Sequence, residues 1–101
     1  MRPMFYLLDA TGRPVPTTFA AWARCADVSQ RIVAQEDPIP GVQVSTVFLG
    51  VDHGAGEGSP VLWETMMFGG THDRRYCEHY TSRADAEAGH RRAVELVIEG
   101  E

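Results

Sequence analysis

The stretch that decides the fold runs from residue 42 to residue 70 and reads VQVSTVFLGV, then DHGAGEGSP, then VLWETMMFGG. Two long apolar runs flank a polar, glycine-rich loop, which is the pattern of a β-hairpin. With a loop over residues 52–60, Val51 faces Val61, Phe48 faces Glu64 and Leu49 faces Trp63. Both faces of the hairpin are then apolar. This register therefore predicts that helices cover one face and that the second face is covered by something else or binds a partner.

Shorter elements are expected on both sides of the hairpin. Apolar and aromatic runs predict strands near residues 4–8, 31–35 and 75–80. A first helix is expected after Thr17 or Thr18, either of which can cap it, and it should end near Asp27.

The last helix has the clearest signals. It follows a capping box at residues 82–85, and its apolar stripe consists of Ala86, His90, Ala93, Val94 and Val97. The elements together predict a single α+β domain over residues 1–101, with an antiparallel sheet of four to five strands and two helices packed on one face.

Composition narrows the class of protein. The chain has 101 residues, of which 44% are hydrophobic, and this is enough for one core. No apolar run approaches the roughly 18 residues that span a bilayer, and the N-terminus does not read as a signal peptide, so we expect a cytoplasmic protein without membrane contact. With 14 acidic and 9 basic residues the net charge is −5. This charge argues against direct nucleic-acid binding and favours a basic partner.

The two cysteines, Cys25 and Cys77, lie far apart and have no metal-ligand spacing. In a cytoplasmic protein such a pair is expected to be two buried or free thiols and not a disulfide or a redox switch. Cys25 falls near the end of the first helix with no partner nearby in sequence, which argues against a nucleophilic role.

Glu64 is the only acidic residue set inside a strongly apolar run. A buried carboxylate needs a partner or a proton, so Glu64 is either a general acid or base, a structural carboxylate bonded to other groups, or a residue near a wet sheet edge. His90, on the stripe of the last helix, is expected to be a core histidine with one hydrogen-bonded nitrogen. A Glu64–His90 pair follows if Glu64 lies beneath that helix.

Asp52 and His53 stand at the mouth of the hairpin loop, with Glu57 farther along it. Histidine and carboxylates can bind a metal or act as a general base. Adjacent strand residues point to opposite faces, however, which favours Asp52 as a turn-former and His53 as a solvated residue. His72 lies in a polar turn after a Gly-Gly pair and is also expected to be solvated.

Several motifs resemble a family of small uncharacterised phage and prophage proteins. They are STVFLG at 45–50 with DH at 52–53, then Gly58, Pro60, Leu62, ETM at 64–66, FGG at 68–70, and Tyr80, Thr81 or Ser82, Ala86, Ala88 and Gly89-His90. The resemblance covers most of the chain and brings no assigned activity. It implies an accessory protein, since phage proteins of this size often bind and block a host machine, including CRISPR effectors.

Three hypotheses follow. The first is a non-catalytic accessory protein, such as an anti-CRISPR-type inhibitor, that binds a host or phage protein in the host cytoplasm without a metal or cofactor. Its contact surface would include Trp63, Asp52, His53, Glu57 and His72. The second is a small metal-dependent or acid–base enzyme that uses Asp52, His53, Glu64 and His90. The third is a structural homodimer that covers the second sheet face with its own copy.

Overall fold

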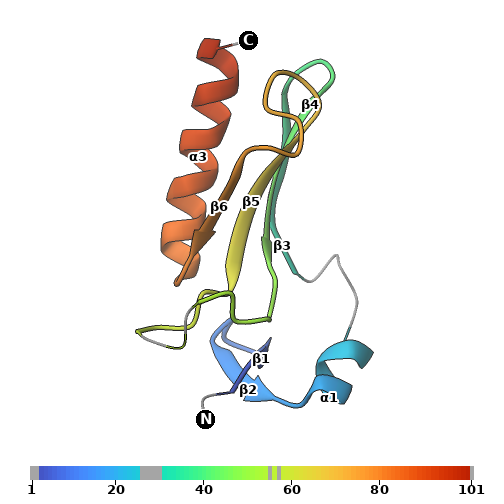
Figure 1. The fold of residues 1–101 in the computed structure, drawn as a ribbon, viewed down its shortest axis with the longest axis vertical. Coiled ribbons are helices and arrows are strands. Elements are labelled where there is room, and N and C mark those ends of the chain that lie inside the picture. The colour runs from blue at the N-terminus through green and yellow to red at the C-terminus, as the bar shows by residue number, and fades with distance from the viewer. Residues whose placement is uncertain (1–2, 26–30, 55, 57, 101) are drawn as a thin grey trace.

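The structure, a computed structural model, describes residues 3–25, 31–54, 56 and 58–100. Within this part of the chain a four-stranded antiparallel sheet has the order β3-β4-β5-β6, and a separate hairpin pairs β1 with β2 (Figure 1). The α+β class is confirmed. The elements are β1 (Phe5–Leu8), β2 (Pro14–Thr17), α1 (Phe19–Arg24), β3 (Ile32–Ile39), β4 (Val42–Phe48), β5 (Trp63–Phe68), β6 (Cys77–Tyr80) and α3 (Arg83–Gly100).

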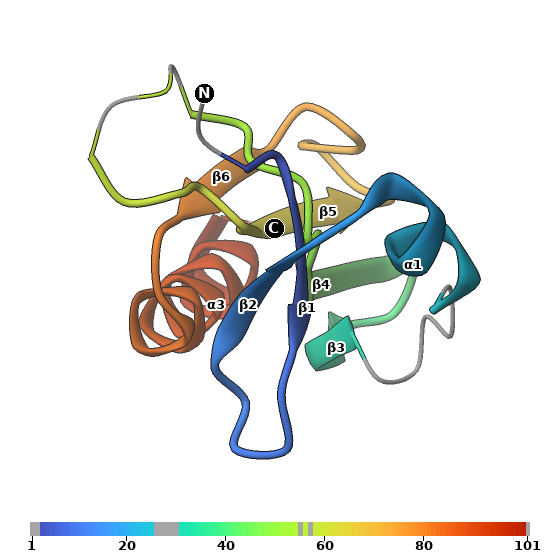
Figure 2. The same cartoon turned by 90° about the horizontal axis from the view of Figure 1, so that it is seen from below.

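Helix α3 lies along one face of the four-stranded sheet, as Figures 1 and 2 show. Its first turn is capped by Ser82, whose Oγ accepts a hydrogen bond from the Asp85 amide at 3.1 Å. The residues that it buries against the sheet are Ala86, Gly89, His90, Ala93 and Val97. The predicted cap and stripe are therefore confirmed. None of the described helices is long and apolar enough to cross a membrane.

The buried core has two parts, one of which includes Tyr6 of β1. One contains Val42, Val44, Met67, Ala93 and Val97, and the other contains Tyr6, Phe48, Leu62, Trp63, Tyr80 and Ala86. Full burial of a side chain such as Met67 stabilises the fold by about 1.5–3 kcal/mol. Trp63 is only 3% exposed and packs edge-on against Phe48, with 5.2 Å between ring centroids.

The register of the central hairpin differs from the predicted one by one residue. Phe48 pairs with Trp63 and Val47 pairs with Glu64. The cause lies beyond Phe48, where Leu49 still bonds to Leu62 but residues 50–52 leave the hairpin and pair with β1. This excursion shifts the count between the strands. Since side chains alternate between faces, a one-residue shift exchanges the face of every residue on one strand relative to the other.

The new register changes the character of the second sheet face. The face turned away from α3, here called the open face, carries Ile32, Gln35, Gln43, Ser45, Val47, Glu64, Met66, Phe68, Cys77 and His79. Half of these residues are polar. The prediction of two apolar faces was therefore wrong, and Trp63 lies in the core beneath α3 and not on the second face.

The β1–β2 hairpin and α1 sit together at the end of the sheet where the chain leaves β4 (Figures 1 and 2). The predicted cap is confirmed because the Ala21 amide donates to Thr18 Oγ1 at 3.1 Å. Phe5 of β1 contacts the rings of Phe19 and Trp22, so α1 packs on β1. The helix ends at Arg24, where the Cys25 amide donates to the carbonyls of Ala21 and Trp22, and so it stops before the predicted end near Asp27, a residue outside the described part of the chain.

Strand β3 joins the main sheet beside β4 and extends beyond the predicted residues 31–35 to Ile39. It includes Pro38, which lacks an N–H, and it is an edge strand with register irregularities. Proline is tolerated at such positions because no neighbouring strand needs its donor.

Candidate functional site

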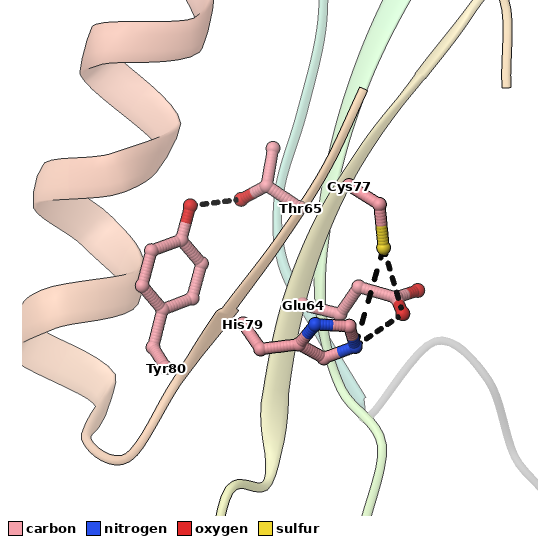
Figure 3. A network of polar contacts seen from close by, with 5 residues as sticks. All are labelled: Glu64, Thr65, Cys77, His79 and Tyr80. Atoms are coloured by element: carbon pink, nitrogen blue, oxygen red, sulfur yellow. Dashed lines mark hydrogen bonds and ion pairs between the residues drawn. The ribbon is translucent and has the colours of Figure 1, made fainter. Parts of the chain in front are cut away.

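Three side chains of different chemistry meet on the open face. Glu64 lies on β5, while Cys77 and His79 lie on β6. The two β6 residues are two positions apart and so point to the same side of the sheet. His79 is directly opposite Glu64 in the strand register. Figure 3 shows the carboxylate, thiol and imidazole turned toward one another.

The contacts within this cluster form a triangle. Glu64 Oε2 is 3.0 Å from His79 Nε2 and accepts a hydrogen bond from Cys77 Sγ at 3.5 Å. The third side, between Cys77 Sγ and His79 Nε2, is 4.0 Å. The Glu64 side chain is 17% exposed and that of His79 is 35% exposed, so the triangle is reachable from solvent.

These separations can be compared with a metal site. Zinc binds sulfur at about 2.3 Å and nitrogen or oxygen at about 2.0–2.2 Å, with tetrahedral angles. That geometry requires ligand atoms about 3.4–3.6 Å apart. The observed sides differ from this by about half an ångström or less. The spacing of the three atoms is therefore close to that of three zinc ligands, and shifts of about half an ångström or less would bring them to it.

The same geometry argues against a cysteine nucleophile activated by a histidine. In such a catalytic set the imidazole uses one nitrogen for the nucleophile and the other for the acid that orients it. Here both Cys77 and Glu64 meet Nε2 of His79. Burial raises the pKa of the Cys77 thiol, and the Glu64 charge and hydrogen bond raise it further. The thiol therefore stays protonated near neutral pH, whereas a bound dication would deprotonate it.

A second polar network lies on the other side of the sheet, beneath α3. His90 is 3% exposed, and its Nδ1 is 2.7 Å from Thr46 Oγ1 while its Nε2 is 2.7 Å from Glu36 Oε1. Thr46 Oγ1 is 2.5 Å from Thr65 Oγ1. The Tyr80 hydroxyl donates to Thr65 Oγ1 at 3.0 Å, and Figure 3 shows this second contact. His90 is thus a core histidine, as predicted, but with both nitrogens bonded.

The partner of Glu64 differs from the one considered from sequence. Glu64 and His90 lie on opposite faces of the sheet, so the possible Glu64–His90 pair does not form. Glu64 pairs with His79, and Glu36 takes the place beside His90.

The residues predicted to form a partner surface do not lie together. Trp63 is in the core, and its indole N–H has no acceptor among the described residues. Asp52 is the predicted turn-former, because its Oδ1 accepts from the amides of Gly54 and Val61. His72 lies in the β5–β6 connection, at the opposite end of the sheet from Asp52 and His53 (Figure 1).

Two further outcomes concern the loop. His53 is exposed and stacks on His79, with 5.3 Å between ring centroids, so it borders the cluster. Glu57 lies outside the described residues.

Sequence reasoning missed Cys77 and His79. Both cysteines are free thiols, as predicted, but the expectation that neither belongs to a ligand set was based on sequence spacing alone. The usable signal was the alternation Cys77-x-His79 in a strand that pairs with the strand of Glu64. Comparisons of the chain with protein-family models, curated proteins and solved structures find no match.

Proposed function

We propose that this protein binds a divalent metal ion of the zinc class at Glu64, Cys77 and His79. The observation that carries the proposal is the triangle of one oxygen, one sulfur and one nitrogen, whose sides are 3.0, 3.5 and 4.0 Å. Other clusters of three such residues are absent from the described part of the chain. Asp52 and His90, which the enzyme hypothesis places in a metal or acid–base site, are not in this set.

The ligand types select the ion. Thiolate, imidazole and carboxylate together suit Zn²⁺, which accepts sulfur, nitrogen and oxygen, whereas Mg²⁺ and Ca²⁺ prefer oxygen alone. A zinc site with three protein ligands keeps its fourth position for water or another ligand, as sites that act on a ligand do. We therefore propose a metal that meets a ligand and not a purely structural ion.

Cobalt(II) spectroscopy tests the site, because Co²⁺ replaces Zn²⁺ and its visible spectrum reports coordination. We expect one equivalent of Co²⁺ to give a thiolate charge-transfer band and tetrahedral d–d bands, and Zn²⁺ to remove both. Cys77→Ser should abolish the charge-transfer band, and His79→Ala should weaken Co²⁺ binding at least tenfold. Cys25→Ser is the matched control, because Cys25 is the other exposed free thiol. A band that survives Cys77→Ser, or that Cys25→Ser removes, contradicts the proposal.

A second candidate function is the protein-binding role expected from the resemblance. We propose that the open face contacts a basic surface of a host or phage protein in the host cytoplasm, for example a CRISPR effector subunit. The supporting observations are that Phe68 remains 38% exposed on a sheet face that α3 leaves uncovered, and that the net charge is −5. An acidic protein associates faster with a basic partner.

Two matched variants test this surface. Phe68→Glu places a charge on the open face, whereas Ile98→Glu places one at a 57% exposed position on α3. A partner captured from the host should be lost with Phe68→Glu and retained with Ile98→Glu. Equal capture by both variants contradicts the proposal. Sedimentation of the purified protein tests the homodimer alternative. A dimer that Phe68→Glu dissociates would show that a second copy of the chain occupies the open face.

A further inference from the structure

We propose that the metal site at Glu64, Cys77 and His79 is one half of a binding site for a small carboxylate with an apolar body. The other half is the neighbouring pocket, which is lined by Trp22, Arg31, Val47, Phe48, Leu49, Val51 and His53. This inference rests on the proposed metal site and names the class of ligand that would reach it. The volume of the pocket is ≈ 350 Å³, which is at the small end of the range of about 300–1,000 Å³ for ligand pockets.

The pocket borders the proposed metal site through two residues. Val47 is directly opposite Glu64 in the register of β4 and β5, so their side chains are neighbours on the open face. His53 stacks on His79 at 5.3 Å between ring centroids. Two residues that line the pocket, Val47 and His53, therefore contact two of the residues proposed to bind the metal, Glu64 and His79.

The wall formed by Trp22 is held in place before any ligand binds. Its indole Nε1 donates to the Leu49 carbonyl at 3.1 Å, and the Arg31 guanidinium lies 4.9 Å from the centre of its ring. Gly50 makes this approach possible, because a Cβ there would lie 2.7 Å from Trp22 Nε1. A preformed wall reduces the ordering cost of binding a ligand.

The chemistry of the two halves selects the ligand. Val47, Leu49 and Val51 offer apolar walls, which favour a hydrocarbon or aromatic body. The metal's fourth position accepts an oxygen ligand such as a carboxylate. Arg31, whose guanidinium donates to the carbonyls of Trp22 and Cys25, adds a positive charge to the wall of the pocket. A monocarboxylate can bind the metal ion and is also attracted by the positive charge of Arg31.

The test uses Co²⁺-loaded protein and three probes: phenylacetate, its neutral analogue phenylacetamide, and acetate. We expect phenylacetate to change the d–d spectrum saturably and to bind at least tenfold more tightly than either of the others. Val47→Phe fills the pocket and should weaken phenylacetate binding at least tenfold while Co²⁺ still binds. Val15→Phe, at an exposed position on β2, is the matched control. If Val47→Phe prevents folding, Val51→Phe replaces it.

The outcomes separate this inference from the metal proposal. If Co²⁺ does not bind at the cluster, the proposed function fails and this inference fails with it. If Co²⁺ binds but acetate is as effective as phenylacetate, the pocket takes no part and only this inference is overturned. The same conclusion follows if the pocket-filling variant binds phenylacetate as tightly as Val15→Phe.

Discussion

Replacing Gly89 with alanine should destabilise the protein, although the same change usually stabilises a helix. Gly89 lies in α3 where the helix meets the Tyr80 ring, and a Cβ there would fall 2.1 Å from the Tyr80 hydroxyl oxygen and 2.3 Å from two ring carbons. Tyr80 is 6% exposed, so its ring has little room to move away. The added methyl group must displace the ring or the helix.

The magnitude follows from three terms. Forcing an extra methyl group into a packed core costs about 1–3 kcal/mol. Displacing the ring also breaks the 3.0 Å hydrogen bond from Tyr80 to Thr65, which contributes about 1 kcal/mol. The helix propensity of alanine returns about 1 kcal/mol. We therefore expect a net loss of about 1–3 kcal/mol in the free energy of unfolding, which lowers Tm by about 4 °C or more.

Urea denaturation followed by circular dichroism measures this loss. Gly100→Ala is the matched control, because Gly100 is in the same helix and a Cβ there meets nothing within 4 Å. It should leave stability unchanged or raise it by up to about 1 kcal/mol. If Gly89→Ala is as stable as Gly100→Ala, the close packing of α3 on Tyr80 is refuted.

Three more predictions address the core, the metal and pH. Trp63→Ala should cost about 3–5 kcal/mol in urea denaturation because Trp63 is 3% exposed, and a change below about 1 kcal/mol would contradict its core position. Zn²⁺ in excess should raise Tm in calorimetry, EDTA should reverse this, and Cys77→Ser should remove the response that Cys25→Ser retains. Burial raises the pKa of Tyr80 above its ordinary 10.0, so the stability that its protonated form contributes is present below pH 10 and is lost as pH rises through the folded-state pKa. In denaturation at several pH values, Tyr80→Phe should reduce this alkaline loss, and an unchanged pH profile would oppose the assignment.

The last helix could be predicted from sequence because its signals are local. The Ser82 cap and the spacing of Ala86, His90 and Ala93 depend only on helical periodicity. The central hairpin was also predicted as an element, for the same reason. Its register was not, because residues 50–52 pair with β1, a segment more than forty positions earlier in the chain. A contact of this range leaves no periodic signal in either segment.

The candidate site depended on that register. Glu64 stood out in sequence as an acidic residue in an apolar run, but its register against β4 was predicted one residue away from the observed one, and its contacts with β6 were not predicted. Cys77 and His79 reach Glu64 only through the pairing of β5 with β6. Their spacing of two residues becomes a ligand spacing only when both residues are on one strand.

The chain of contacts from Tyr80 to Glu36 has a direction. The Tyr80 hydroxyl donates a hydrogen bond to Thr65 Oγ1, and each threonine hydroxyl can donate only one hydrogen bond. With a neutral imidazole, Thr65 therefore donates to Thr46, Thr46 donates to Nδ1 of His90, and Nε2–H donates to Glu36. An imidazolium would donate from Nδ1 and turn both hydroxyls around. The orientation of the hydroxyl protons of Thr46 on β4 and Thr65 on β5 therefore depends on whether the buried imidazole of His90 is neutral or charged. The three side chains change their hydrogen bonds together.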